Sequence, residues 1–178
     1  MVDALITSGA VPDATFLWWD VRLQPALGTV EVRVMDAQSS VAEGAPLIAL
    51  TQSLARLALE GEPPDSWVGP ELLAENRFLA ARDGLDARLI DPATRTLVPV
   101  RKSVEALVRE CRPHAAALGC SAELERVSWL AAANGAVRQR AWDCHGGDLA
   151  PLVSALTDQF IARPEAVSYS IDRPGRSD

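Results

Sequence analysis

Four charged residues alternate with apolar residues in two neighbouring segments near the start of the chain: Asp20 and Arg22, then Glu31 and Arg33. Successive side chains of a strand point to opposite faces, so two paired strands would bring all four onto one face. A carboxylate such as Glu31 can bind Mg²⁺ through its oxygens, and a guanidinium such as Arg33 can hold phosphate oxygens in a bidentate contact. The pattern is consistent with two structures: a phosphate- and metal-binding site, or a solvated face with surface ion pairs.

The two segments have the composition of β-strands joined by a turn. Residues 16–23 and 29–35 alternate in character, and the connection between them contains Pro25 and Gly28. This spacing predicts an antiparallel hairpin. Its other face is apolar, and we expect it to pack on helices; it carries Leu17, Trp19, Val21, Leu23, Val30, Val32 and Val34. A two-stranded sheet is not stable by itself, so further strands or a covering layer are required.

Helical periodicity dominates the rest of the chain. The clearest apolar stripe runs over residues 100–118, and further helices are predicted at about 44–60, 70–83, 121–134, 136–144 and 149–160. We predict that the helix at 44–60 begins near Gly44, because Pro46 would be misplaced deep inside a helix. A short helix is expected to end at Ser8, and residues 85–96 could hold a small hairpin. The predicted fold class is α+β, an antiparallel hairpin followed by a mostly helical region.

Composition narrows the class of protein. The chain has 178 residues, a formal net charge of −7, 48% hydrophobic and 23% charged residues, which is typical of a folded domain. The acidic balance and a single lysine, Lys102, weigh against a nucleic-acid partner. No apolar run approaches the length of a membrane span, and the first residues lack a signal-peptide pattern. We therefore expect a cytoplasmic protein with no nucleic-acid or membrane partner.

The cysteines do not suggest a disulfide framework or a zinc site. Cys111, Cys120 and Cys144 are an odd number with no C-x-x-C pair. A zinc site that added His114 or His145 to them is disfavoured, because Cys111 lies in the apolar stripe of a predicted helix. We expect reduced thiols.

Three blocks of sequence together resemble one family. They are residues 19–23 with 29–36, residues 75–87 (ENRFLAARDGLDA) and residues 135–140 (GAVRQR). They are similar to the bacterial carboxylate–amine ligases of the type 2 glutamate–cysteine ligase family. The resemblance implies that the hairpin is part of a curved, glutamine synthetase-like sheet. It also implies that residues 1–163 form the carboxy-terminal half of a catalytic domain, followed by a flexible tail at 164–178.

The same resemblance assigns expected roles to individual residues. It implies that Glu31 is a metal ligand, that Arg33 clamps the transferred phosphate and that Arg22 is a second catalytic cation. Asn76 and Arg77 are weaker candidates for contacts with the nucleotide or substrate, and a polar pair on a helix surface is an equal alternative for them.

A second arginine pair, Arg138 and Arg140, belongs to the third block. Cationic side chains often lie near helix ends for electrostatic reasons alone, so we expect a structural or solvent-facing role for both.

The chemistry that the resemblance implies uses ATP and Mg²⁺ or Mn²⁺. ATP phosphorylates the carboxylate of an amino-acid substrate, and an amine then attacks the acyl phosphate. The paired glutamates and the His-x-His strand of such ligases are missing here, and the two histidines, His114 and His145, lie in predicted helical regions. The resemblance also implies that the sequence starts within a helix that comes midway through such ligases.

Three hypotheses follow. The chain could act with an amino-terminal ligase half docked at the edge of its sheet. It could be a non-catalytic module derived from such a ligase that self-associates or binds a partner through that edge. It could be an unrelated, complete metal-dependent enzyme, which is least favoured because too few carboxylates converge.

Overall fold

In the computed structural model, the described residues are 2–61, 68–132, 134–142 and 149–161. The chain divides into two compact units, Met1–Ala37 and Gln38–Asp178. The predicted tail at 164–178 lies outside the described residues, as do Cys144 and His145.

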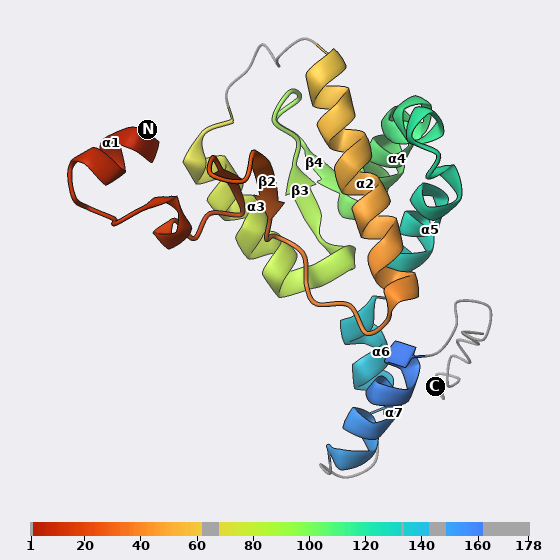
Figure 1. Ribbon diagram of the computed structural model, residues 1–178. Helices are drawn as coiled ribbons and strands as arrows, with labels where there is room; N and C mark the ends of the chain where they lie inside the picture. Colours follow the sequence, from red (N-terminus) through yellow and green to blue (C-terminus); the bar gives the residue numbers. More distant parts are fainter. Residues whose placement is uncertain (1, 62–67, 133, 143–148, 162–178) are drawn as a thin grey trace. The chain divides into compact units, whose positions relative to one another are not determined.

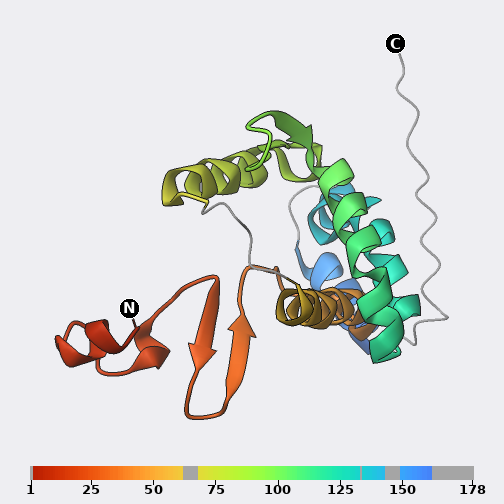
Figure 2. The same ribbon diagram turned by 90° about the horizontal axis from the view of Figure 1, so that it is seen from above.

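The first unit contains the predicted hairpin. Its elements are helix α1 (Val2–Thr7), the 3₁₀ turn η1 (Ala14–Phe16) and the strands β1 (Val21–Gln24) and β2 (Thr29–Val32). The strands pair antiparallel, as the two arrows in Figure 2 show. Gly28 closes the turn at a φ of 62°, a left-handed conformation that glycine adopts without strain. The hairpin is confirmed, with strands shorter than predicted: Phe16 belongs to η1, β1 begins at Val21 and β2 ends at Val32.

The apolar face of this hairpin is not buried as expected. Pairing places Val21 opposite Val32 and Leu23 opposite Val30 on one face. Val21 is 50%, Leu23 57% and Val30 59% exposed. The polar face is the covered one, because η1 and the residue after it lie against Arg22. Within the first unit these side chains are exposed, and the expectation that the apolar face packs on helices stays a prediction.

The second unit is built on three packed helices, α2 (Val41–Glu60), α4 (Val100–Leu118) and α5 (Ser121–Ala132), which Figure 1 shows side by side. The predicted stripe of α4 supplies Val108, Cys111 and Ala115 to the core. The core cluster consists of Ala49, Val108, Cys111, Ala115, Cys120, Leu124 and Val127. Leu118, the last residue of the predicted stripe and of α4, is 41% exposed.

Smaller elements complete this unit. They are α3 (Pro70–Asp83), η2 (Gly84–Asp86), β3 (Arg88–Ile90), β4 (Leu97–Pro99), α6 (Gly135–Trp142) and α7 (Ala150–Ile161). β3 and β4 form the small antiparallel hairpin that the sequence allowed at 85–96, extended to Pro99. The α+β class is confirmed. Among the helices of the described ranges, none combines the length and hydropathy that a bilayer span requires.

The start of α2 differs from the prediction. The helix begins at Val41, three residues before Gly44, and includes Pro46. Because Pro46 lies in the second turn, it removes only one bond of the ladder near the helix start, the bond to the carbonyl of Ala42. Pro46 is also fully buried, so its ring contributes to packing.

Candidate functional site

The polar face of the first hairpin holds a compact charged group. We call Arg22, Gln24, Glu31 and Arg33 the hairpin cluster. Arg22 and Glu31 are direct cross-strand partners, and Arg22 Nε lies 2.6 Å from Glu31 Oε2. Arg33 Nη1 lies 3.3 Å from the other carboxylate oxygen, Oε1. The pairing register therefore places one carboxylate between two guanidinium groups, as strand alternation predicted for these residues.

Backbone carbonyl groups fix the position of Arg22. Its Nη1 donates to the carbonyl of Thr15 at 2.5 Å and to that of Leu17 at 3.4 Å. The turn that presents these carbonyls is capped by Asp13, whose Oδ1 accepts from Thr15 N at 2.7 Å. The Arg22 side chain is consequently only 12% exposed. Arg22 is a fixed, covered cation.

Arg33 is the more accessible of the two cations. Its side chain is 33% exposed, and its Cζ lies 4.8 Å from the centroid of the Trp18 ring. Its backbone N–H donates to the carbonyl of Asp20 at 2.7 Å, which continues the pairing of the two strands by one residue on each side. Arg33 is thus held by the Trp18 ring and by Glu31 while part of its guanidinium faces solvent.

Gln24 lies beside the ion pair. Its amide fits best with the oxygen turned towards Arg22, 3.0 Å from Nε and 3.2 Å from Nη2. The hydrogen bond from Arg22 is the main cause that holds the pKa of Glu31 below its ordinary value, and the positive charges of Arg22 and Arg33 add to it. Glu31 is therefore an ionised carboxylate at neutral pH.

The two arginines and one glutamate of the hairpin cluster leave one net positive charge, and the cluster does not by itself form a complete site for a divalent metal. Mg²⁺ takes near-octahedral coordination by oxygens. Glu31 supplies one carboxylate, and guanidinium groups contact both of its oxygens. In the described ranges there is no group of three His, Cys, Asp or Glu residues that could hold a metal ion. A metal at Glu31 would need ligands from outside these residues, so the metal-ligand role of Glu31 stays a prediction.

Asn76 has backbone partners in the second unit. From α3, its Nδ2 donates to the carbonyl of Ile90 at 2.9 Å, and its Oδ1 accepts from Ile90 N at 2.7 Å. Both amide atoms therefore attach α3 to strand β3. This is a structural role, and the predicted contact of Asn76 with a nucleotide stays a prediction.

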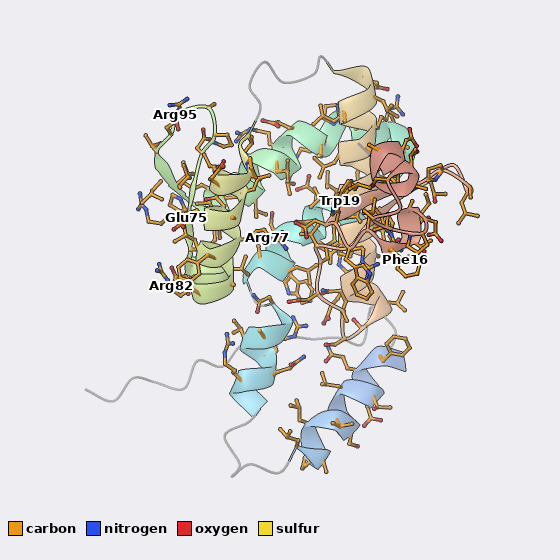
Figure 3. The ribbon with its side chains drawn as sticks, turned by 90° about the vertical axis from the view of Figure 1, so that its left-hand side faces the viewer. Phe16, Trp19, Glu75, Arg77, Arg82 and Arg95 are labelled. Atoms are coloured by element: carbon orange, nitrogen blue, oxygen red, sulfur yellow. The ribbon has the colours of Figure 1, made fainter. Side chains whose placement is uncertain are left out.

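Arg77 follows on the same helix and is exposed. Figure 3 shows Arg77 on one side of α3 and Glu75 and Arg82 on the other, as their spacing along a helix requires. Arg82 pairs with Asp83 at 2.7 Å and lies over the Phe78 ring. Arg77 and the hairpin cluster belong to different compact units, and the predicted role of Arg77 in nucleotide or substrate contact stays a prediction.

Sequence reasoning missed Glu43 as a key residue. Glu43 is fully buried at the start of α2, and its Oε1 accepts from Arg138 Nη2 at 2.6 Å and from Gln159 Nε2 at 2.8 Å. Its Oε2 accepts from Ser39 N at 3.0 Å. The pattern Ser40-x-x-Glu43 is a capping-box signature, which could have identified Glu43 as a residue of the helix start, although Ser40 makes no side-chain cap hydrogen bond here. Nothing local could have identified its partners on α6 and α7.

The expected structural role of Arg138 agrees with this contact. Its side chain is 16% exposed, and its Cζ lies 5.9 Å from the Trp129 ring centroid. Arg140, two residues later on α6, is exposed. The described contacts of Arg138 hold α6 to α2.

Comparisons with known proteins agree with the resemblance. Residues 2–153 match the family described as glutamate-cysteine ligase family 2. A Rubrobacter xylanophilus protein named "Putative glutamate--cysteine ligase 2-3" is 44% identical over 158 residues, covering 88% of this chain and 42% of the relative. A Thermobifida fusca protein named "Putative glutamate--cysteine ligase 2" is 36% identical over 180 residues, which cover 97% of this chain and 44% of the relative. The chain thus spans less than half the length of these relatives, and it belongs to glutamate-cysteine ligase family 2.

Proposed function

We propose that the chain is the carboxy-terminal part of an ATP-dependent carboxylate–amine ligase of the glutamate–cysteine type. The observation that carries the proposal is the hairpin cluster, where a carboxylate fixes two arginines beside each other. Family membership supports the reaction class, and the names of the relatives support glutamate and cysteine as substrates.

In this proposal the arginines bind the phosphate that moves from ATP to the substrate carboxylate. Arg33, a third exposed, would contact the phosphate oxygens, because a guanidinium matches their geometry and charge. Arg22 would hold Glu31 in place and add positive charge behind it. Positive charge fixed before the reaction stabilises the charge that develops in phosphoryl transfer. The amine of the second substrate then displaces the phosphate from the acyl phosphate.

The remaining part of the ligase has to supply what this chain lacks. One carboxylate, contacted by two guanidinium groups, is insufficient for the metal ions that accompany ATP in this reaction class. In the complete enzyme, Glu31 would contribute one ligand to a metal site that other carboxylates complete. Mg²⁺ or Mn²⁺ would neutralise charge on the phosphates when bound.

The test uses an assembled ligase. The chain is co-expressed with the part of the Rubrobacter relative outside the matched segment, which we call the complementing part. ADP release and dipeptide formation are measured with ATP, Mg²⁺, glutamate and cysteine. We expect Arg33→Met to lower kcat at least tenfold. The matched control is Arg109→Met, an exposed arginine on α4. Equal activity of both variants would contradict the role of Arg33.

A second candidate function is a non-catalytic, self-associating or partner-binding module derived from such a ligase. The exposed apolar face of the hairpin favours it, because such a face is typical of an interaction surface. An assembled complex that forms but never turns over ATP would support this candidate.

We also infer a cytoplasmic location. The support is chemical: Cys111 and Cys120 are buried free thiols, which is usual in a reducing compartment.

A further inference from the structure

The guanidinium of Arg22 is held from two directions. On one side its Nε donates to Glu31 Oε2, across the pair of strands, at 2.6 Å. On the other side its Nη1 donates to the carbonyl of Thr15 at 2.5 Å and to that of Leu17 at 3.4 Å. These two carbonyls belong to the segment before β1, so the orientation of Arg22 depends on the conformation of that segment as well as on strand pairing. All of these contacts lie within the first unit.

Asp13 fixes the conformation of this segment. It is the cap residue at the start of η1 and has an extended backbone. Its Oδ1 accepts from Thr15 N at 2.7 Å and also from the Thr15 hydroxyl. η1 has three residues, and few backbone hydrogen bonds hold so short a turn. The side-chain cap therefore contributes strongly to where the Thr15 carbonyl points.

The Asp13 side chain is ionised at neutral pH. The hydrogen bond from the Thr15 hydroxyl, followed by that from Thr15 N, holds the pKa of Asp13 below its ordinary value, and the positive charge of Arg22 adds a smaller lowering. The carboxylate is thus an acceptor at neutral pH, and its charge acts on Arg22 in addition to the turn that it caps.

The position of Arg22 decides how Glu31 and Arg33 pair. Arg22 Nε takes Glu31 Oε2, and Arg33 Nη1 lies 3.3 Å from the other oxygen, Oε1. If Arg22 moved away, both oxygens would be open to Arg33, and a guanidinium and a carboxylate favour a bidentate pair. An arginine held in such a pair has fewer N–H groups left for phosphate oxygens.

We propose that Asp13 is a positioning residue for the arginines of the hairpin cluster. By capping η1 it places two carbonyls against Arg22, and Arg22 in turn keeps Glu31 from pairing with Arg33 alone. The inference rests on the proposed function, in which Arg33 contacts the transferred phosphate. The role of Asp13 is indirect and needs no contact with ATP or substrate.

Three variants separate this role from a general loss of structure. Asp13→Ala removes the cap. Asp13→Asn keeps an oxygen that can accept from Thr15 N, since asparagine caps turns and helix starts as well as aspartate does. The matched control is Asp91→Ala, which removes the same kind of turn from the second unit. There Asp91 Oδ1 accepts from Ala93 N at 2.9 Å and from Thr94 N at 2.8 Å.

The first measurement is NMR spectroscopy of the whole chain, which follows the hydrogen exchange of the Arg22 Nε–H group and the pKa of Glu31. We expect Asp13→Ala to speed this exchange about fivefold, as the loss of a side-chain cap does locally. The pKa of Glu31 should rise, because the hydrogen bond from Arg22 is the main cause of its lowering. Removal of the negative charge of Asp13 alone would shift that pKa the other way. Asp13→Asn and Asp91→Ala should match the wild type in both readouts.

The second measurement is the kinetics of the ligase assembled with the complementing part. Asp13→Ala should lower kcat about fivefold or more and leave the KM for ATP within about twofold, because the arginines act on the phosphoryl group during its transfer. Asp13→Asn should keep the kcat of the wild type.

Circular dichroism and hydrogen exchange of the strand amides at 21–24 and 29–32 establish whether each variant folds. If Asp13→Ala loses the hairpin, Thr15→Val takes its place. Valine lacks the hydroxyl that donates to Asp13 and keeps the backbone N–H and carbonyl of that position. We then expect changes of the same sign and smaller size in the Arg22 exchange, the Glu31 pKa and kcat.

Three results would overturn the inference: an Arg22 exchange rate and a Glu31 pKa that Asp13→Ala leaves unchanged, a failure of Asp13→Asn to restore them, or full activity of Asp13→Ala in the assembled ligase. The two NMR readouts need no turnover. An assembled wild type without activity therefore refutes the proposed function, while the NMR readouts still decide whether Asp13 positions Arg22.

Discussion

Arg22 and Glu31 occupy directly opposite positions of the first hairpin, and 2.6 Å separates Arg22 Nε from Glu31 Oε2. Cross-strand partners on one face are near neighbours, so register alone brings these two side chains together. Arg33 reaches the same carboxylate from two residues beyond Glu31. The polar face is therefore assembled by local pairing within residues 22–33. Any function of the polar face therefore depends first on correct pairing of the two strands.

The Glu31 carboxylate should titrate below its ordinary pKa of about 4.3. The hydrogen bond from Arg22 is the main cause, so Arg22→Met should raise the pKa of Glu31 towards that value. Because the folded pKa is the lower one, the ion pair stabilises the hairpin fully above the ordinary pKa, and this stabilisation is lost as the pH falls through the lowered pKa. NMR titration of the Glu31 carboxyl carbon measures this pKa in the wild type and in the variant. An unchanged pKa in the variant would contradict the assigned cause.

Loss of the ion pair between Glu43 and Arg138 should lower the stability of the chain strongly. Arg138→Met removes the guanidinium that lies 2.6 Å from the fully buried carboxylate, so the free energy of unfolding should fall by about 3 kcal/mol or more. Urea unfolding followed by circular dichroism measures the loss. Arg140→Met is the control on the same helix and should change stability by less than about 0.5 kcal/mol. Similar stabilities for both variants would show that Glu43 does not hold α6.

The Asn76 contact gives a prediction that separates its structural role from a nucleotide role. Asn76→Ala removes both hydrogen bonds to Ile90 and should lower the free energy of unfolding by about 1–3 kcal/mol. Hydrogen exchange of the Ile90 amide should accelerate. Asn76→Asp keeps the acceptor for Ile90 N and should preserve much of the protection of that amide. If Asn76→Ala weakened only ATP binding by the assembled ligase, the structural role would be wrong.

The buried thiol of Cys111 should be unreactive in the folded chain. Burial raises the pKa of Cys111, and the negative charge of Glu110 raises it further. At pH 8 the thiolate needed for alkylation is therefore scarce as well as covered. Mass spectrometry after iodoacetamide treatment should show modification of Cys111 only after denaturation. Rapid modification of the native chain would place Cys111 outside the core.

Local patterns predicted much of this fold. The alternation around Arg22 and Glu31 predicted the hairpin and its charged face, and the stripe of α4 predicted Cys111 as a core residue. The start of α2 was missed, because the helix accommodates Pro46 in its second turn at the loss of a single bond of the ladder.

The remaining features depend on contacts that sequence patterns do not encode. Glu43 and Arg138 are 95 residues apart, so no period links them. The exposure of Leu23 could not be predicted either, since alternation identifies an apolar face without showing what covers it. The roles of Arg33 and Glu31 came from the family resemblance and remain to be tested by mutation.

The most direct test of the central claim is ligase activity of the chain with and without the complementing part. ADP release and dipeptide formation from glutamate and cysteine are measured on the isolated chain, on the complementing part and on the co-expressed complex, each with ATP and Mg²⁺. We expect that only the complex is active and that Glu31→Gln abolishes most of its activity. Turnover by the isolated chain, or a stable complex whose activity Glu31→Gln leaves unchanged, would contradict the central claim.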